Sequence, residues 1–315
     1  MTRVFVSGAA GVIGTSLVPK LLAAGHDVLA GDLKPMPKDF SSSVIYLQGD
    51  LNELETKTIA NFEPEAFIHL AATFERSAES PGFWTDNFVN NVSLSHHLST
   101  LALNSGSIRR LVNASSYLVY DPSLYMTATR SEPAYGLSEL ANVHPRNLIG
   151  SAKYFHELEL EFMERAIESP MVITNARIFR GYGRGSRDVI SRWVRSLLAE
   201  ETIEVYGQEG VFDYVFADDS AEGLLRIMEN HELPTTLNLG GGIGRSVRDI
   251  CSILVKHFPA ASIHYGEDIQ MLERSVADIS LLEQNLGWRP EHSLEQGIEE
   301  IIKFEKTVLT GRENA

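Results

Sequence analysis

The fold is decided by Gly8-Ala9-Ala10-Gly11-Val12-Ile13-Gly14, a GxxGxxG spacing that directly follows the apolar run at residues 4–6. An apolar strand that ends in glycines and opens a helix is typical of a dinucleotide-binding unit. Glycine lets a pyrophosphate approach the N–H groups at the helix start, and the third glycine allows the helix to pack closely on the strand. The spacing alone is weak evidence, so its context matters.

A carboxylate in the right place supports this interpretation. The second apolar run, residues 28–30, leads to Asp32, 18 residues after Gly14. A carboxylate there accepts hydrogen bonds from the adenosine ribose and repels a 2′-phosphate, so NAD is favoured over NADP. Asp50 and Leu51 stand where a residue contacting adenine would lie, although an aspartate in an ordinary turn explains Asp50 equally well.

Apolar runs alternate with helical periodicity from the start to about residue 177. This pattern predicts an α/β fold with a Rossmann-type doubly wound parallel sheet and a smaller α/β C-terminal substrate domain. We expect strands at residues 4–6, 28–30, 66–70, 111–114 and 172–174. We expect helices at about 12–24 (kinked at Pro19), 86–104, 151–168, 187–199 and 219–230, the last capped by Asp218 or Asp219.

A chain of 315 residues exceeds what one core usually supports, so two units sharing a cleft are expected. We assign residues 1–177 and about 211–237 to the NAD-binding Rossmann domain. Residues at about 178–210 and 238–315 are assigned to the substrate-binding domain.

Composition narrows the class of protein. With 43% hydrophobic and 22% charged residues and no apolar run near the roughly 20 residues of a membrane span, we expect no membrane insertion. The first residues lack the pattern of a secretory signal, and Cys251 is the only cysteine, so a cytoplasmic location and a thiol buried in the core are expected. No Cys/His/Asp grouping has metal-ligand spacing, and no metal is expected.

The net charge of −15 disfavours nucleic acid and anionic lipid as partners. An anionic small molecule would need a local group of arginines. Such a group occurs at Arg180, Arg184, Arg187, Arg192 and Arg195.

Several further segments carry a family resemblance. They read Phe67-Ile68-His69-Leu70-Ala71-Ala72, Ser115-Ser116-Tyr117-Leu118-Val119-Tyr120, Ala176-Arg177-Ile178-Phe179-Arg180-Gly181-Tyr182-Gly183, Tyr214 to Asp219, and Arg274 to Ser280 with Leu286-Gly287-Trp288-Arg289-Pro290. In this order they resemble the extended short-chain dehydrogenase/reductases, specifically the nucleotide-sugar epimerase/dehydratase branch. The resemblance implies an NAD-dependent enzyme that acts on a nucleoside-diphosphate sugar by hydride transfer at a sugar carbon. It also implies a homodimer held by two helices of each subunit.

The resemblance assigns roles to single residues. Ser116 would orient a sugar hydroxyl and Lys153 would bind the nicotinamide ribose. Val12 and Ile13 in the glycine loop, and Leu70, Ala71 and Ala72 after the fourth strand, would lie beside the cofactor. The family's catalytic tyrosine, four residues before the lysine, is replaced by Ile149, which can neither donate nor accept a proton.

Three explanations of this departure stay open. Some sugar 4,6-dehydratases and 5-epimerases resembling this group carry an apolar residue there and recruit another base, a carboxylate or a tyrosine elsewhere in the cleft. Alternatively, Tyr135 folds into the vacant position. Lastly, the protein is a catalytically silent NAD- or sugar-nucleotide-binding regulator.

The substrate end also departs from the pattern. Arg180 replaces an asparagine, and Phe212 stands where many members have a diphosphate-binding arginine; Arg274 matches a second such arginine. Because a diphosphate needs charge-assisted donors, we expect Arg76, Arg180, Arg184 and Arg274 to contact substrate. Arg192 and Arg195 are expected to be solvated helix residues.

Overall fold

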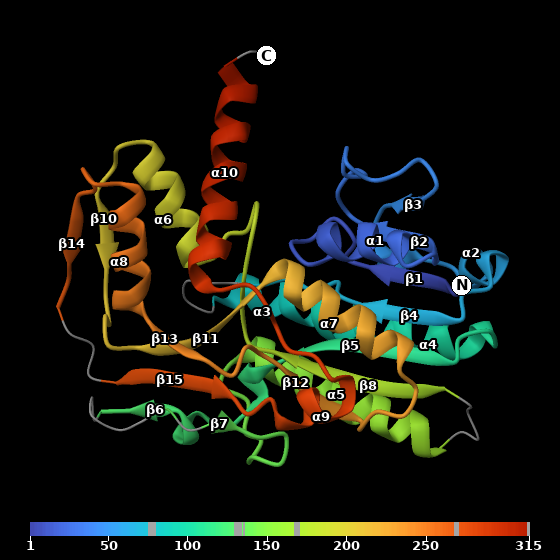
Figure 1. The fold of residues 1–315 in the computed structure, drawn as a ribbon. Helices are drawn as coiled ribbons and strands as arrows, with labels where there is room; N and C mark the ends of the chain where they lie inside the picture. Colours follow the sequence, from blue (N-terminus) through green and yellow to red (C-terminus); the bar gives the residue numbers. More distant parts are fainter. Residues whose placement is uncertain (75–79, 129–133, 135, 167–170, 268–270, 314–315) are drawn as a thin grey trace.

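The larger sheet consists of seven parallel strands in the order β12-β8-β5-β4-β1-β2-β3 (Figure 1). The computed structural model describes residues 1–74, 80–128, 134, 136–166, 171–267 and 271–313. The strands of this sheet are β1 (Arg3–Ser7), β2 (Asp27–Asp32), β3 (Ile45–Gln48), β4 (Ala66–His69), β5 (Arg110–Ser116), β8 (Val172–Ile178) and β12 (Thr236–Leu239). The chain builds outward from β1 to β3, then returns to the other side at β4. In open parallel sheets, ligands bind at such a reversal, outside the carboxyl ends of the strands.

Alternating side chains of the central strands build the two cores of this unit. Val4, Val6 and Ile68 belong to one core cluster, which contains side chains of α1 (Gly14–Ala23) and α7 (Ala217–Glu229). Phe5 and Phe67 belong to the cluster on the other face, with α4 (Leu94–Ser105) and α5 (Leu148–Ala166), and their rings stack at 4.8 Å. The predicted Rossmann-type fold is therefore confirmed, since helices cover both faces of a parallel sheet.

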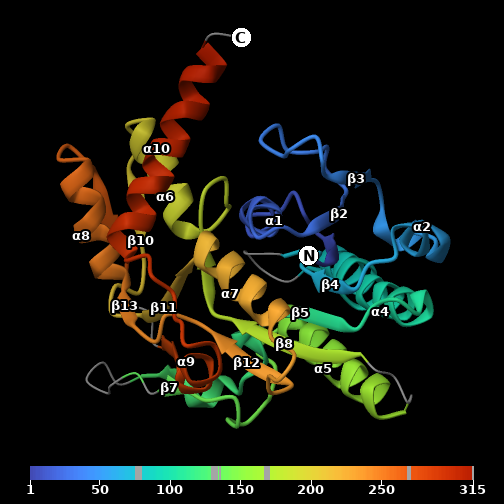
Figure 2. The same ribbon diagram turned by 45° about the vertical axis from the view of Figure 1, so that its right-hand side comes forward.

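A second sheet lies beside the carboxyl ends of these strands (Figure 2). Its order is β13-β11-β15-β6, with β7 joined to β15 and β9 to β11. The strands are β6 (Met126–Thr127), β7 (Gly136–Leu137), β9 (Arg180–Tyr182), β11 (Val211–Phe216), β13 (Gly244–Ser246) and β15 (Leu272–Ala277). A parallel pair, β10 (Ile203–Val205) and β14 (Ile263–Tyr265), and the helices α6 (Val189–Leu198), α8 (Val247–His257) and α10 (Leu294–Glu313) complete this part.

Most expected elements are present, with some corrections. The segment at 86–104 is divided into α3 (Pro81–Asn87), a π-helix (Phe88–Ser93) and α4. The backbone cap of α7 is Phe216, so Asp218 and Asp219 lie in its first turn and do not cap it. α1 is continuous through Pro19. The remaining α-helices of the described residues are α2 (Thr56–Phe62) and α9 (Ser280–Leu286).

The division into two domains stays a prediction, but the sheets suggest a different border. β11 pairs with β9, β13 and β15 of the second sheet, whereas we expected its residues in the Rossmann part. β12 is the edge strand of the large sheet and extends to Leu239.

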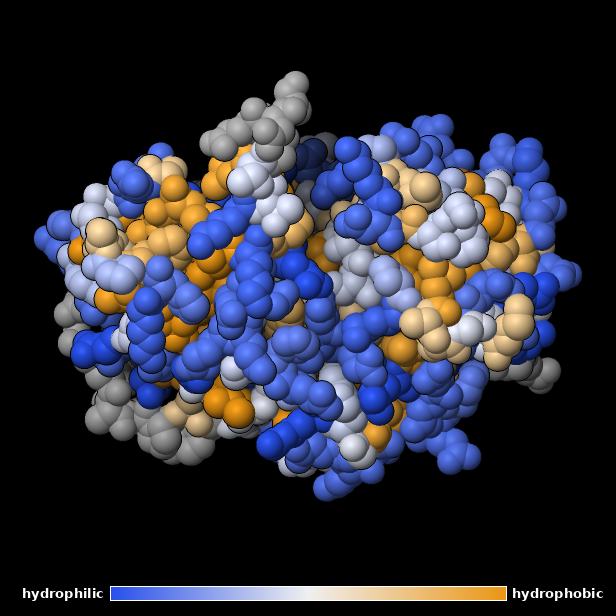
Figure 3. Space-filling view, turned by 45° about the horizontal axis from the view of Figure 1, so that its top comes forward, coloured by the Kyte–Doolittle hydropathy of each residue, from blue (hydrophilic) through white to orange (hydrophobic). Residues whose placement is uncertain are grey.

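Hydrophilic side chains cover much of the face in Figure 3, with hydrophobic patches on either side. Among the described residues, no helix is both long and apolar enough to cross a membrane. Cys251 is buried in the core of the second part, as expected.

Candidate active site

The glycine loop lies between β1 and α1 with no room for side chains at its key positions. Gly8 has φ +72°, and a Cβ there would lie 2.6 Å from the backbone nitrogen of Ala71. A Cβ on Gly14 would lie 2.5 Å from the carbonyl oxygen of Gly8. No hydrogen bond within the described chain engages the N–H groups of Val12 and Ile13. These features fit a pyrophosphate over the helix start.

Asp32 ends β2 beside this loop. Its carboxylate accepts hydrogen bonds from the backbone N–H groups of Ala10 (2.9 Å) and Lys34 (2.9 Å). Asp50 caps a short 3₁₀ helix and accepts from the backbone of Asn52 at 2.9 Å, as an aspartate in an ordinary turn does. The residues at this edge therefore fit an NAD molecule whose adenosine lies toward Asp32.

The start of α5 packs tightly on the end of β5. Asn147 accepts a hydrogen bond from the N–H of Gly150 at 2.9 Å, which satisfies one free donor of the helix start. A Cβ on Gly150 would lie 2.4 Å from the carbonyl oxygen of Leu118. This close approach brings α5, which carries Lys153, against the segment that carries Ser116.

Lys153 is buried, at 8% exposed. Burial lowers the pKa of its ammonium to about 8, although nearby Glu157 acts in the opposite direction. Glu157 is itself held by Arg177, with 2.7 Å between Oε2 and Nη2. Such a lysine is costly to bury and is typical of a functional position. Ile149 lies in the hydrophobic core, so it places no polar atom near the lysine.

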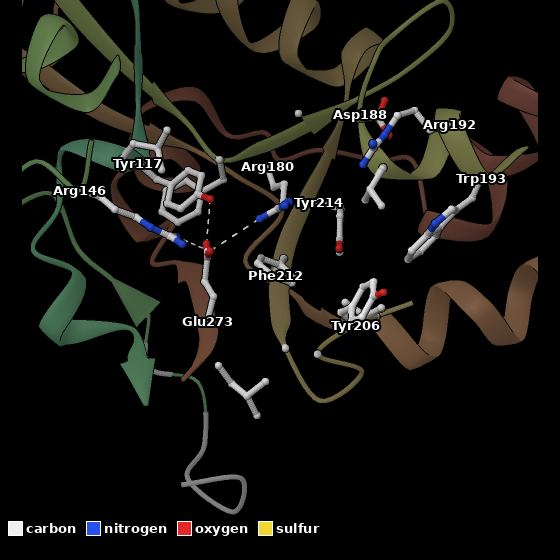
Figure 4. A pocket seen from close by; sticks show the side chains of 18 of the residues that line it. Tyr117, Arg146, Arg180, Asp188, Arg192, Trp193, Tyr206, Phe212, Tyr214 and Glu273 are labelled. Atoms are coloured by element: carbon white, nitrogen blue, oxygen red, sulfur yellow. Dashed lines mark hydrogen bonds and ion pairs between the residues drawn. The ribbon is translucent and has the colours of Figure 1, made fainter. Parts of the chain in front are cut away.

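A cavity of about 1140 Å³ is lined by Ser116 and by residues of the second sheet and α6. Figure 4 shows part of its wall. Ser116 accepts a hydrogen bond from the N–H of Leu118 at 3.2 Å. Polar and aromatic residues on the cavity wall include Tyr117, Arg146, Asn147, Arg180, Asp188, Arg192, Trp193, Tyr206, Phe212, Tyr214 and Glu273.

A buried carboxylate, Glu273 on β15, organises one end of the cavity. Its Oε1 accepts hydrogen bonds from the hydroxyls of Tyr117 (2.8 Å) and Ser275 (2.7 Å). Its Oε2 pairs with Arg146 and lies 3.7 Å from Nη1 of Arg180. The three partners in the cavity converge on this carboxylate in Figure 4.

The guanidinium of Arg180 lies over the ring of Phe212, the residue that stands where many family members have an arginine. Its guanidinium carbon lies 4.1 Å from the centre of the Phe212 ring, a cation–π contact. Because β9 pairs with β11, Arg180 on one strand reaches the position of Phe212 on the other. Positive charge is thus present at this point of the cavity although residue 212 carries none.

The other predicted arginines have different surroundings. Arg184 is bound to Asp218 at 2.6 Å and does not line the cavity. Arg274 donates to the carbonyl of Glu209 at 3.3 Å and is also outside the cavity wall. Arg192, expected to be merely solvated, lines the cavity. Arg76 and Tyr135 lie outside the described residues.

Sequence reasoning missed Arg146, Glu273, Trp193 and Tyr206. They come from separate segments, and no spacing in the chain marks them as a group. Glu273 stands beside Arg274 and Ser275, so the sequence around it does not mark it as a buried carboxylate.

Together the glycine loop with its acidic partner and the polar cavity beside the strand ends define an NAD-dependent enzyme of the Rossmann type. The chain belongs to the NAD dependent epimerase/dehydratase family, whose model matches residues 4–240. This confirms the predicted family, its cofactor NAD, and the class of enzyme, an NAD-dependent sugar-nucleotide epimerase or dehydratase.

Relatives match over nearly the whole chain. A UDP-glucose 4-epimerase of Mycolicibacterium smegmatis is 28% identical, over 96% of this chain and 98% of the relative. A dTDP-glucose 4,6-dehydratase of Xanthomonas campestris is 25% identical, over 98% and 95%. The solved structure of MoeE5 in complex with UDP-glucose and NAD is 27% identical, with a TM-score of 0.82 over 98% of this chain and 99% of that one.

Proposed function

We propose that this protein epimerises or dehydrates a nucleoside-diphosphate sugar, with UDP-glucose and dTDP-glucose as the first substrates to test. The observation that carries the proposal is the cavity that joins Ser116, at the end of β5, to Arg180 on β9 and Arg192 on α6. The names of the relatives, which act on these two nucleotide sugars, support the choice.

The residues along the cavity suggest how the substrate lies. The sugar would sit near Ser116, and the diphosphate would pass Arg180 and Arg192, because guanidinium groups bind phosphate oxygens bidentately. Trp193 and Tyr206, at the far end in Figure 4, would hold the nucleobase between aromatic faces. In this arrangement the Rossmann part would bind the cofactor and the second part would bind the substrate.

The roles of the chain's own groups follow from this placement. NAD, when bound, would supply the acceptor and later the donor for a hydride at a sugar carbon. The hydroxyl of Ser116, which accepts from the backbone, keeps its proton for donation to a sugar oxygen. The ammonium of Lys153 would donate to the ribose of the cofactor. Ile149 requires that the proton of the sugar hydroxyl be accepted elsewhere.

The decisive experiment is incubation of the protein with NAD in deuterated water with UDP-, dTDP-, GDP- and CDP-sugars, followed by NMR of the sugar signals. Deuterium uptake or a new product is the expected result. Inertness across the panel, with NAD bound, would instead support the catalytically silent binding protein that Ile149 suggests.

We also propose that the enzyme is a homodimer. Exposed aromatic side chains gather on neighbouring helices: Trp84 (58% exposed) on α3, Phe88 (62%) on the π-helix and Phe162 (65%) on α5. A cluster of this kind is typical of an interface. Sedimentation should give the dimer mass, and Phe162→Glu should shift it to the monomer. Leu140→Glu, which alters an apolar side chain that is exposed elsewhere, should leave the mass unchanged.

The proposed location is the cytoplasm. Cys251 is the only thiol of the chain, so the fold does not depend on an internal disulfide.

A further inference from the structure

Three tyrosines, Tyr117, Tyr206 and Tyr214, line the cavity. Tyr206 lies at the opposite end from Tyr117 (Figure 4), and the other two differ in one respect that matters for proton transfer. The hydroxyl of Tyr214 is buried and has no hydrogen-bond partner among the described residues. The hydroxyl of Tyr117 donates to Glu273 at 2.8 Å. Only Tyr117 therefore has an acceptor that can take its proton as it receives another.

The position of Tyr117 also favours contact with the reacting sugar. It follows Ser116 directly in the chain, and both residues line the cavity. Its ring stacks on Phe179, with 5.3 Å between the ring centres, which holds the side chain in place.

The carboxylate of Glu273 is arranged so that one oxygen is available for a proton. Arg146 and Arg180 both lie at Oε2, whereas Tyr117 and Ser275 donate to Oε1. The arginines hold the carboxylate in position from one side. The hydroxyls on the other side define the path of the proton.

We propose that Tyr117 and Glu273 form the proton-transfer pair of this enzyme and replace the tyrosine lost at position 149. This inference rests on the proposed function, since it concerns the same site. As the sugar O–H bond breaks, its proton moves to Oη of Tyr117, and the proton of Tyr117 moves to Oε1 of Glu273. The electron pair left on the sugar oxygen forms the C=O bond as hydride leaves the carbon for NAD. Return of the protons by the same path accompanies return of the hydride.

This pair differs from an ionised tyrosine acting alone. Burial, the largest cause, raises the pKa of Tyr117, and the charge of Glu273 raises it further, so the hydroxyl stays protonated. A tyrosine that is always protonated can still relay a proton, provided that a carboxylate accepts it. Glu273 meets this condition by direct hydrogen bonding.

The first test detects contact with the sugar without relying on turnover. Tyrosine is labelled with ¹³C at the ring carbon that bears the hydroxyl, and the signal of Tyr117 is assigned by its absence in Tyr117→Phe. With NAD bound, adding UDP-glucose or dTDP-glucose should shift this signal, whereas UDP or dTDP should not. Binding of the sugar nucleotide with an unmoved Tyr117 signal would overturn the inference but not the proposed function. If neither binds, the titration is repeated with the GDP- and CDP-sugars, and failure of all of them to bind would overturn both.

The second test separates catalysis from binding. Tyr117→Phe should lower kcat about 100-fold or more and leave the affinity for the sugar nucleotide within about threefold. Tyr182→Phe is the matched control, because Tyr182 is a buried tyrosine outside the cavity wall whose hydroxyl has no partner in the described chain. Full turnover by Tyr117→Phe, or an equal loss in the control, would contradict the relay.

In Glu273→Gln the amide oxygen can still accept a hydrogen bond from Tyr117, but the amide cannot take up its proton. We therefore expect a loss of kcat similar to that of Tyr117→Phe. Since the two residues act as a unit, the double variant should be no slower than the slower single variant. Additive losses would mean that the two side chains act separately and would overturn the pair. If Glu273→Gln does not fold, the ¹³C signal of Tyr117 in the parent protein and the turnover of Tyr117→Phe decide whether the relay exists.

Discussion

Ile149 lies one helical turn before Lys153 on α5, and both side chains are nearly inaccessible, at 4% and 8% exposed. The isoleucine belongs to the core cluster and contributes packing where the family resemblance expects a proton carrier. Ile149 therefore has a packing role of its own at this position and does not simply mark the loss of a tyrosine.

Ile149→Tyr should not restore a missing activity. The larger ring has to fit into a packed core, which costs about 1–3 kcal/mol of stability. We expect a lower melting temperature and an unchanged or lower kcat. A large gain in turnover would show that the ordinary tyrosine is compatible with this site.

Gly8→Ala should weaken NAD binding about tenfold or more, because the added Cβ meets the backbone of Ala71 at 2.6 Å. Gly106→Ala is the matched control. Gly106 has a similar φ of +67° but nothing within 4 Å of the added Cβ, so it retains only the backbone strain. Calorimetric titration with NAD measures both. Equal affinities in the two variants would argue against the glycine loop as the cofactor site.

Asp32→Asn should reduce the preference for NAD over NADP about tenfold or more, because it removes a charge that repels a 2′-phosphate. Asp121→Asn is a suitable control, since this aspartate caps another short helix and accepts from Ser123 at 2.8 Å. The ratio of the two dissociation constants is the measurement. An unchanged ratio in Asp32→Asn would place the adenosine ribose elsewhere.

Lys153 should make stability depend on pH in a characteristic direction. Its pKa is about 8 in the folded chain and about 10.5 in the unfolded chain, so the unfolded state binds more protons between these values. Its charge therefore destabilises the fold below pH 8, by about 3 kcal/mol, and the penalty is lost as the pH rises to about 10.5. Lys153→Met should be more stable than the parent at pH 7, and the difference should decline toward pH 10. Urea unfolding of both proteins at several pH values measures this difference in unfolding free energy. A difference that does not change with pH would show that the ammonium is not buried.

The glycine loop could be predicted from the sequence because it is local, and the Rossmann sheet could be predicted because each of its strands carries its own apolar run. Gly8, Gly14 and Asp32 lie within one strand–helix–strand unit, so their spacing in the chain determines their spacing in the fold. The sugar end of the cavity is different, because Tyr117, Glu273 and their arginines meet only when β5, β9 and β15 are assembled. Position 212 shows why this end of the cavity could not be predicted. The arginine expected there is replaced by Phe212, and the positive charge comes from Arg180 on the neighbouring strand.

Arg180 should therefore carry the charge that residue 212 does not supply. Arg180→Gln removes a charge-assisted donor, and we expect the affinity for UDP or dTDP to fall about ten- to hundredfold. Arg195→Gln is the matched control, because Arg195 is paired with Glu305 at 2.7 Å and does not line the cavity. Arg184→Gln should lower the melting temperature through the loss of the Asp218 ion pair while leaving the affinity nearly unchanged. If Arg184→Gln weakens binding and Arg180→Gln does not, the diphosphate lies toward α7 rather than over Phe212.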